Sequence, residues 1–401
     1  MSILRLLARV LLPAAMMRAL AALAAAFGAA SAAPAQNSYQ QVIDRAVAGG
    51  IPGIQAVVLV GDREWAGVAG VSAVERRRAM QRGNRLRVAS ITKMFTYAVI
   101  VELARRGRLG LDDRAVDRLA PGTLDGIPHA GEIRIRHLLE HVSGVHNFNG
   151  EQGADFFAAL YGDRRRSSRL WTARELIAFA RRPNNWPTGT PGERRSYSST
   201  GYIILELIAE RAGGAPLPLL YRRFIFDPLG MRRTGVEGHD LTARDIVDSY
   251  GQPPADAAAG TPSPFAGRRA VRADGLVNLS AGLRTYNGWA RGAGAAASTA
   301  CDLARFMHAV VAGRMTVLQD QQQTFAAAAA RPLATFGWNG GAEGIQASIV
   351  YAPASDAIVV VLTNGTNVGD TSQDIARRLL EAVRAGGDGA AEPAAPSNCP
   401  P

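Results

Sequence analysis

The stretch Arg87-Val88-Ala89-Ser90-Ile91-Thr92-Lys93 contains the single lysine of the 401-residue chain, and the other 44 of its 45 basic residues are arginine. Apolar residues recur with helical spacing from Ser90 to Arg106, and Gly107 ends the pattern. Lys93 therefore lies about one helical turn after Ser90, within reach of its hydroxyl. Arginine keeps its proton in proteins, whereas burial can make a lysine release one. The pair thus predicts a serine nucleophile that is activated by an amine.

The first 32 residues read as a secretory signal peptide. Three arginines precede an apolar run over residues 19–27, and Ala30-Ser31-Ala32 offers a small-residue cleavage site. The run is too short to span a bilayer, although an uncleaved anchor helix that begins near Ile3 is an alternative. We therefore expect a periplasmic or secreted protein.

The order of elements predicts one α+β domain over residues 36–385. Strand patterns predict a hairpin over residues 54–71 and a second one over residues 345–362. Between about 110 and 310 the pattern is helical and rich in loops. This order favours one antiparallel sheet that is assembled from both ends of the chain, with an all-helical region inserted and a cleft between the two parts. The Gly-, Ala- and Pro-rich tail, 386–401, is expected to be disordered.

Amphipathic helices are expected within the inserted region. The clearest candidates are residues 135–141, 172–181, 202–211 and 302–311. Thr299 and Asp302 resemble a capping box at the start of the last of these. The stretch 252–294 is rich in Gly, Ala and Pro, and two interpretations stay open for it: a functional loop over the cleft or a mobile segment.

Charge and cysteine content limit the partners of the chain. The formal net charge is +11, or +8 without the three arginines of the signal peptide. The arginines are spread out and no stripe of aromatic residues accompanies them, so we expect no nucleic-acid binding and only loose attraction to anionic envelope polymers. Cys301 and Cys399 are the two cysteines. Export would permit a disulfide between them, and two separate thiols are equally compatible with the sequence.

Further short motifs follow the Ser-x-x-Lys pair in a fixed order. They are Leu109-Gly110-Leu111-Asp112-Asp113, His137-Leu138-Leu139-Glu140-His141-Val142-Ser143-Gly144, Tyr197-Ser198-Ser199 and Trp338-Asn339-Gly340-Gly341, with Ile51-Pro52-Gly53 before the first strand. In this order they resemble the serine β-lactamase-like hydrolases, a group of class C β-lactamases, penicillin-binding D-peptidases and related secreted esterases. The resemblance covers about Tyr39 to Val383 and implies the β-lactamase/transpeptidase-like fold.

The resemblance also implies a role for each site residue. Ser90 would form an acyl-enzyme with the substrate carbonyl, while Lys93 and Tyr197 would move its proton. The backbone N–H groups of Ser90 and of Gly341, the latter on an inner strand of the sheet, would form the oxyanion hole. The group needs no cofactor or metal for this chemistry.

Two departures from the family pattern bear on the substrate. Ser199 stands where the family's Tyr-x-Asn motif has asparagine, and Trp338-Asn339-Gly340 stands where many members have Lys-Thr-Gly. Tryptophan offers one N–H donor and no charge, so Trp338 cannot anchor a carboxylate as lysine can. With Ser199, Trp338 and Gly340 as substrate-binding positions, the pattern favours neutral esters, unless an arginine elsewhere supplies the missing cation.

Three functions from different classes remain open. The first is an exported serine esterase of small acyl substrates. The second is a D-amino-acid peptidase or weak β-lactamase that acts on peptidoglycan-type substrates, and the third is an inactive binding protein on the same fold. Tyr197 could also be a buried core residue. His137 and His141 have a spacing that can bind zinc, but packing or capping roles are favoured because no third ligand is evident. The sequence does not indicate an oligomeric state.

Overall fold

The computed structural model describes residues 34–150, 154–162, 169–181, 189–253, 263–265, 267–281, 286–315, 327–386 and 399. The predicted signal peptide lies outside the described residues, as does the predicted disordered tail apart from Gly386 and Cys399. Within the described ranges we find no helix with the length and apolar character needed to cross a membrane.

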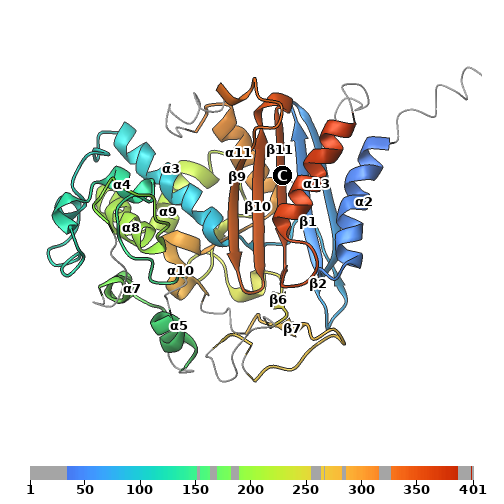
Figure 1. Cartoon of the computed structure of the whole chain (residues 1–401), viewed down its shortest axis with the longest axis horizontal. Coiled ribbons are helices and arrows are strands. Elements are labelled where there is room, and N and C mark those ends of the chain that lie inside the picture. Colours follow the sequence, from blue (N-terminus) through green and yellow to red (C-terminus); the bar gives the residue numbers. More distant parts are fainter. Residues whose placement is uncertain are drawn as a thin grey trace, which may run out of the picture.

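A six-stranded antiparallel sheet forms the centre of the molecule, in the order β3-β2-β1-β11-β10-β9 (Figure 1). Its strands are β1 (Gly53–Val60), β2 (Arg63–Ala73), β3 (Arg78–Ala79), β9 (Phe336–Ala342), β10 (Ile345–Ala352) and β11 (Ala357–Thr363). The first three come from the start of the chain and the last three from its end, and β1 pairs with β11. The predicted sheet built from both ends of the chain is therefore confirmed.

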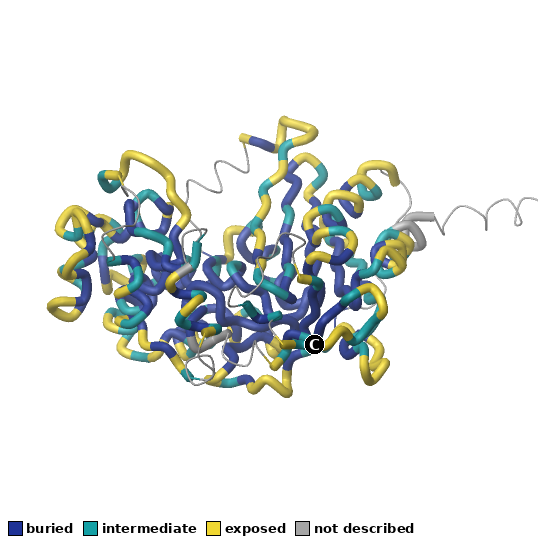
Figure 2. The backbone as a smooth tube through the Cα atoms, turned by 60° about the horizontal axis from the view of Figure 1, so that its bottom comes forward, coloured by how far each residue is buried: buried dark blue, intermediate teal, exposed yellow. Residues whose placement is uncertain are grey.

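Both faces of the sheet are covered, which explains the long apolar runs in its central strands. Val359 and Val361 of β11 pack against α2 (Pro34–Ala48) and α13 (Ser372–Ala385). Val360, which lies between them, points to the opposite face of the sheet. There it belongs to the main core, where α11 (Ala300–Val311) lies. Successive side chains of a strand point to opposite faces, so a doubly covered strand has to be apolar throughout. Figure 2 shows these strands as buried and the outer faces of the helices as exposed.

The inserted region is helical and packs beside β9 (Figure 1). Its helices are α3 (Thr92–Arg105), α4 (Ile135–Leu139), α5 (Ala154–Tyr161), α7 (Ala173–Ala180), α8 (Ser199–Gly213), α9 (Leu217–Tyr221) and α10 (Tyr286–Gly294). Short helical turns are η1 (Ala89–Ile91), η2 (Ala115–Arg118), η3 (Ala130–Glu132), η4 (Arg222–Phe226), η5 (Ala243–Asp245) and η6 (Pro353–Ser355). The four predicted helices correspond to α4, α7 and α8 of this region and to α11 behind the sheet, with ends that shift by a few residues.

Two short three-stranded sheets complete the fold. Four of their strands, β5 to β8, lie in the stretch that the sequence predicted to be all-helical, so that stretch is not purely helical. One has the order β4-β8-β5 and the other β12-β6-β7. The first contains β4 (Leu86–Arg87), β5 (Gly235–Val236) and β8 (Ala296–Ser298), and the second β6 (Tyr250–Gly251), β7 (Val277–Asn278) and β12 (Gly365–Thr366). Strand β4 of the first sheet ends just before η1 and pairs with β8, so this sheet supports the turn that carries Ser90.

The capping box expected at α11 is only half formed. The Thr299 hydroxyl accepts the Asp302 N–H at 3.1 Å, as predicted. The Asp302 carboxylate instead accepts the N–H of Arg233 (2.9 Å) and the hydroxyl of Thr234 (2.8 Å). The aspartate therefore ties α11 to the strand region before β5, a use that the local sequence pattern did not reveal.

Cys301 of α11 and Cys399 form a disulfide. Cys399 is buried, and its N–H donates to the Glu64 carboxylate at 3.0 Å. Of the two states that the sequence left open, the structure has the bonded one. The end of the chain is thus attached to the helix that backs the sheet.

Candidate active site

A tight turn between β4 and α3 presents Ser90. Ala89 has φ +44°, in the left-handed region that residues other than glycine seldom adopt. The Ile91 N–H donates to the Val88 carbonyl at 3.1 Å, which closes the turn. Val88 and Ala89 are fully buried, whereas Ser90 is partly exposed. The surrounding packing therefore holds a strained backbone so that the serine side chain points outward at the start of a helix.

Ser90, Lys93 and Tyr197 meet, as the sequence predicts. The Lys93 Nζ donates to Ser90 Oγ at 3.1 Å, and the Tyr197 hydroxyl donates to the same oxygen at 2.8 Å. The Lys93 ammonium nitrogen lies 4.9 Å from the centre of the Tyr197 ring. Tyr197 is 43% exposed, so it is a cleft residue and not the core phenol of the alternative interpretation. The Ser90 hydroxyl thus has two groups of a type that can transfer protons within hydrogen-bond distance.

Burial favours the neutral form of the Lys93 amine. Its side chain is 6% exposed, and desolvation lowers its pKa below the ordinary lysine value, while the nearby Tyr197 phenol opposes this shift. Apart from Ser90, its described hydrogen-bond acceptor is the neutral carbonyl of Ala293, at 2.7 Å. A buried ammonium group without a carboxylate partner loses hydration that nothing replaces fully. Lys93 is therefore set up to accept a proton.

A kink in α10 places the Ala293 carbonyl against Lys93. Arg291 has non-helical dihedral angles inside α10, φ 41° and ψ −138°. Buried Glu206 of α8 holds this kink, because it accepts the Gly292 N–H at 2.9 Å and the Arg291 guanidinium at 2.5 Å. Burial raises the pKa of Glu206, and Arg291 opposes that shift. The position of Lys93 thus depends on a buried contact between α8 and α10.

His141 supports Tyr197 from behind. Its ring stacks on Tyr197 with centroids 4.5 Å apart, and its Nδ1 accepts the N–H of Ser198 at 3.2 Å. Burial, with smaller effects from Lys93 and Arg195, lowers the pKa of His141 to about 4. The imidazole is therefore neutral at neutral pH and keeps a free lone pair for the Ser198 N–H. His141 positions the phenol and the start of α8.

His137 has a different task from His141. Its Nδ1 accepts the N–H of Arg134 at 3.3 Å, at the start of α4. The two histidines therefore serve as the capping and packing groups that the sequence analysis favoured for them. Within the described ranges we find no cluster of three or more His, Cys, Asp or Glu residues placed to hold a metal ion.

Strand β9 packs Gly340 against the turn that carries Ser90. A Cβ atom on Gly340 would lie 2.1 Å from the Val88 carbonyl oxygen and 3.1 Å from the Ser90 nitrogen, so only glycine fits. A Cβ atom on Gly341 would contact nothing within 4 Å. The expectation of an inner strand is wrong, because β9 is an edge strand of the described sheet. An edge strand leaves alternate N–H groups unpaired and available to a ligand.

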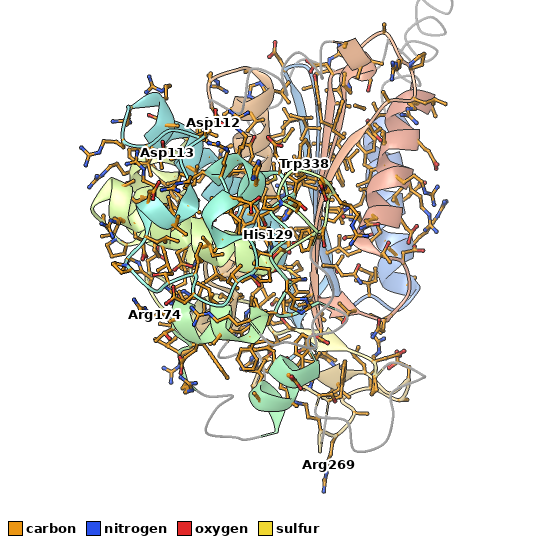
Figure 3. The ribbon with its side chains drawn as sticks, turned by 60° about the vertical axis from the view of Figure 1, so that its left-hand side comes forward. Asp112, Asp113, His129, Arg174, Arg269 and Trp338 are labelled. Atoms are coloured by element: carbon orange, nitrogen blue, oxygen red, sulfur yellow. A yellow bond between two sulfur atoms is a disulfide. The ribbon has the colours of Figure 1, made fainter. Side chains whose placement is uncertain are left out.

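The remaining substrate-binding candidates separate in the structure. Trp338 lines the cleft, where the sheet meets the helical region (Figure 3). Ser199 does not line it: it is buried at the first position of α8, and its N–H donates to the Asn147 side-chain carbonyl at 2.9 Å. Ser199 therefore has a structural contact in place of the expected substrate contact.

The cleft above Ser90 encloses about 510 Å³. Besides Ser90, Lys93, Tyr197 and Trp338, its walls contain Met94, Tyr97, Leu139, Glu140, His141, Arg195, Tyr202, Phe306, Val310, Gly337 and Asn339. Most of these side chains are apolar or aromatic, and Glu140 and Arg195 are the charged ones other than Lys93. This size and lining suit a small organic molecule. The sequence did not single out Arg195, although it lies two residues before Tyr197.

The family model described as Beta-lactamase matches residues 39–384, which include every residue of this site. The chain belongs to the beta-lactamase family. Its fold is the β-lactamase/transpeptidase-like fold, and its homologues are serine hydrolases. The resemblance seen in the sequence is therefore confirmed.

Relatives in this family carry different names. Penicillin-binding protein 4* of Bacillus subtilis is 30% identical over 181 residues, which are 45% of this chain and 37% of that protein. Esterase EstB of Burkholderia gladioli is 28% identical over 188 residues, 46% of each chain. The matches span less than half the length of these relatives.

A solved structure shows the same fold over nearly its whole length. The D-amino acid amidase from Ochrobactrum anthropi SV3, complexed with L-phenylalanine amide, superposes with a TM-score of 0.71 at 22% identity. The superposition covers 88% of this chain and 99% of that one. Both the sheet and the inserted helical region are therefore common to the two proteins.

Proposed function

We propose that this protein is a serine hydrolase that cleaves small acyl esters through an acyl-enzyme on Ser90. The observation that carries the proposal is the meeting of the Ser90 hydroxyl with a buried lysine of lowered pKa and with a phenol. This arrangement can remove the serine proton without a histidine base. The arrangement also favours a catalytic function over an inactive binding protein, because a binding protein does not need these three side chains in contact.

The first half of the reaction forms the acyl-enzyme. Ser90 Oγ attacks the ester carbonyl carbon while its proton passes to the Lys93 and Tyr197 pair. The negative charge that develops on the carbonyl oxygen is stabilised by the N–H groups of Ser90 and Gly341. The bond to the alcohol then breaks, and the alcohol leaves with a proton from the Tyr197 hydroxyl.

The second half releases the acid. A water molecule gives a proton to the same pair and attacks the acyl carbon, and the ester bond to Ser90 breaks. The proton returns to Ser90 Oγ, so the site is restored. Because Tyr197 is exposed to the cleft and Lys93 is buried behind it, the phenol is the partner that can reach both the leaving group and the water.

The cleft wall supports neutral acyl substrates. Trp338 occupies the position where a lysine would bind a carboxylate, and Met94, Phe306 and Val310 give apolar surface nearby. A methylene group placed on such a wall gains about 0.8 kcal/mol when it leaves water. The relative named Esterase EstB agrees with this choice of substrate class.

A second candidate is cleavage of peptides or amides that end in a carboxylate, as in peptidoglycan stems. Arg195 favours it, because its cation lines the same cleft and can replace the lysine that the third motif lacks. The relative named penicillin-binding protein 4* also supports this candidate. The two candidates share the acyl-enzyme and differ in the group that Arg195 would contact.

Export to the periplasm or the exterior is part of the proposal. The sequence of the first 32 residues supports it, and so does the Cys301–Cys399 bond, since disulfides persist in oxidising compartments. N-terminal sequencing of protein purified from cell fractions tests this directly. A start near Ala33 in the periplasmic or secreted fraction is the expected result, and an intact leader in the cytoplasm contradicts it.

A three-substrate panel tests the function. A short-chain p-nitrophenyl ester, a D-Ala-D-Ala peptide and a chromogenic cephalosporin are each given to the wild type and to Ser90→Ala. We expect the ester to be turned over fastest, with a loss of at least about 10³-fold in Ser90→Ala. Intact-protein mass spectrometry after brief exposure should show an acyl adduct on the wild type alone. Faster turnover of the peptide would favour the second candidate, and no turnover or adduct would refute both.

A further inference from the structure

A second cavity lies away from the cleft and is lined by arginines. It encloses about 800 Å³ between the β2–β3 turn, η5 and the segment that follows η5. We call it the basic cavity and define it by Arg76, Arg78, Arg87, Arg244, Asp245 and Asp248. None of the residues that line it lines the cleft above Ser90. The reaction proposed above therefore does not use this cavity.

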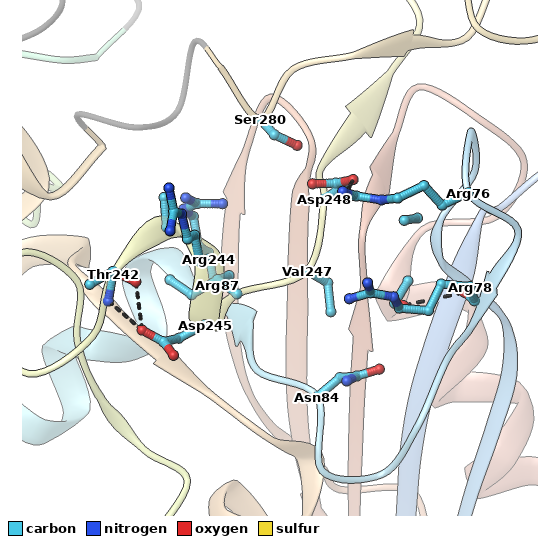
Figure 4. Close-up of a pocket in the computed structure, with 14 residues that line it drawn as sticks. Arg76, Arg78, Asn84, Arg87, Thr242, Arg244, Asp245, Val247, Asp248 and Ser280 are labelled. Carbon is cyan, nitrogen blue, oxygen red and sulfur yellow. Dashed lines mark hydrogen bonds and ion pairs between the residues drawn. The ribbon is translucent and has the colours of Figure 1, made fainter.

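The guanidinium groups enter the basic cavity from two sides. Figure 4 shows Arg76 and Arg78 on one side and Arg87 and Arg244 on the other. Arg76 lies in the turn after β2 and Arg78 begins β3, with Arg77 between them, so this basic run places two of its three side chains on the cavity. Arg77 has φ +47° and does not line the cavity. The turn therefore directs charge toward one place.

Internal ion pairs use only part of this charge. Arg87 is buried and pairs with Glu237 through two hydrogen bonds of 2.7 and 2.8 Å. Arg76 pairs with Asp248 at 2.8 Å. The Asp245 carboxylate accepts the N–H and hydroxyl of Thr242, both at 2.7 Å, and these bonds lower its pKa.

Arg78 and Arg244 are left over from this pairing. Within the described ranges neither one forms an ion pair with a carboxylate, and both are exposed. A planar guanidinium group binds phosphate or carboxylate through two parallel hydrogen bonds. Two such groups that face one cavity from opposite sides suit a ligand with more than one anionic group. The volume is that of a typical small-molecule site.

We propose that the basic cavity binds a ligand with at least two phosphate or carboxylate groups, held by Arg78 and Arg244. The ligand is either a free polyanion of low molecular weight or a segment of an anionic polymer, because both present the same groups. This second site is independent of the proposed esterase, since it shares no residue with the cleft.

Calorimetric titration at low ionic strength tests the proposal with inorganic pyrophosphate, citrate and long-chain polyphosphate. We expect wild-type protein to bind at least one of them with a dissociation constant below about 1 mM, and Arg78→Gln and Arg244→Gln each to weaken binding about tenfold. Arg77→Gln is the matched control, because it removes the same charge from the position next to Arg78 without touching the cavity lining, and it should change affinity less than twofold. The circular dichroism spectra and thermal unfolding midpoints of all three variants should equal those of the wild type, which shows that they are folded.

Each outcome decides the proposal. Binding of pyrophosphate or citrate identifies a free polyanion, and binding of polyphosphate alone identifies a polymer segment. If Arg77→Gln weakens binding as much as Arg78→Gln, the attraction is only the general field of a basic protein and the site does not exist. Absence of binding by all three probes also overturns it.

Discussion

The cleft and the basic cavity are both lined by basic side chains, but Lys93 in the cleft differs in burial from Arg78 and Arg244 in the basic cavity. In the cleft, Lys93 is buried, has a lowered pKa, and donates to no carboxylate of the described residues. In the basic cavity, Arg78 and Arg244 are exposed to water. A buried lysine can exchange a proton, whereas an exposed arginine can only attract an anion. The difference explains why a chain with 44 arginines has a lysine at one position.

Lys93→Arg removes this difference, and we expect it to have the largest effect. Arginine cannot accept the Ser90 proton, so kcat/KM for a p-nitrophenyl ester should fall by about 10³-fold or more. Stopped assays on protein with an unchanged circular dichroism spectrum measure the loss. Turnover near the wild-type level would show that Ser90 is not activated by an amine.

Two substitutions at Gly341 test whether the cleft, unlike the basic cavity, stabilises a charge that develops during the reaction. Gly341→Pro removes one N–H of the proposed oxyanion hole, and we expect kcat to fall by about 10²- to 10³-fold. Gly341→Ala keeps that N–H and adds a methyl group where the structure has open space, so kcat should change little. Equal losses in both variants would mean that the site tolerates no side chain there and that the N–H is not the cause.

The lowered pKa of His141 should make the free energy of unfolding depend on pH. Its pKa is about 4 in the folded protein and about 6.5 when unfolded, so below pH 6.5 the unfolded chain takes up the proton first. The wild type should therefore lose up to about 3 kcal/mol relative to His141→Asn as the pH falls from 7 to 4. Urea unfolding at several pH values measures this difference. Parallel stability curves for the two proteins would contradict it.

Arg195 lines the cleft and could bind an anionic group there, as Arg78 and Arg244 are proposed to do in the basic cavity. Its replacement has the smallest expected effect. Arg195→Gln should raise KM about tenfold for a peptide with a free carboxylate and leave KM for a neutral ester unchanged. Arg194→Gln, the neighbour outside the cleft lining, is the matched control. If both variants leave the KM for the peptide unchanged, the cleft has no carboxylate anchor at this position.

The sheet and the start of the site could be predicted because their signals are local. The apolar runs of β1 and β11 follow from burial on both faces, and the spacing of Ser90 and Lys93 follows from one helical turn. Tyr197 is 107 residues from Ser90, so no periodicity could join them. It was placed by the resemblance of motifs, and the structure puts its hydroxyl on the serine.

Other parts of the site carry no usable signal in the side chains. Strand β9 reads Phe-Gly-Trp-Asn-Gly-Gly-Ala, and its glycines are disfavoured in strands although close packing on the Ser90 turn requires Gly340. The partner of Lys93 is a backbone carbonyl, which any residue at position 293 would supply. His141 was noticed for its spacing from His137, but its contact with Tyr197 depends on tertiary packing.

The covalent link between Cys301 and Cys399 closes a ring of about 100 residues that contains β9, β10, β11 and α13. In the chain-entropy model, closing a ring of this size restricts the unfolded chain by roughly 4–5 kcal/mol. The same helix that carries Cys301 also carries Phe306 and Val310 of the cleft wall. Protein that is produced in a reducing compartment should therefore lack this disulfide and the stability that it adds. Oxidation after synthesis is accordingly a step to control in any preparation whose activity is to be compared with another.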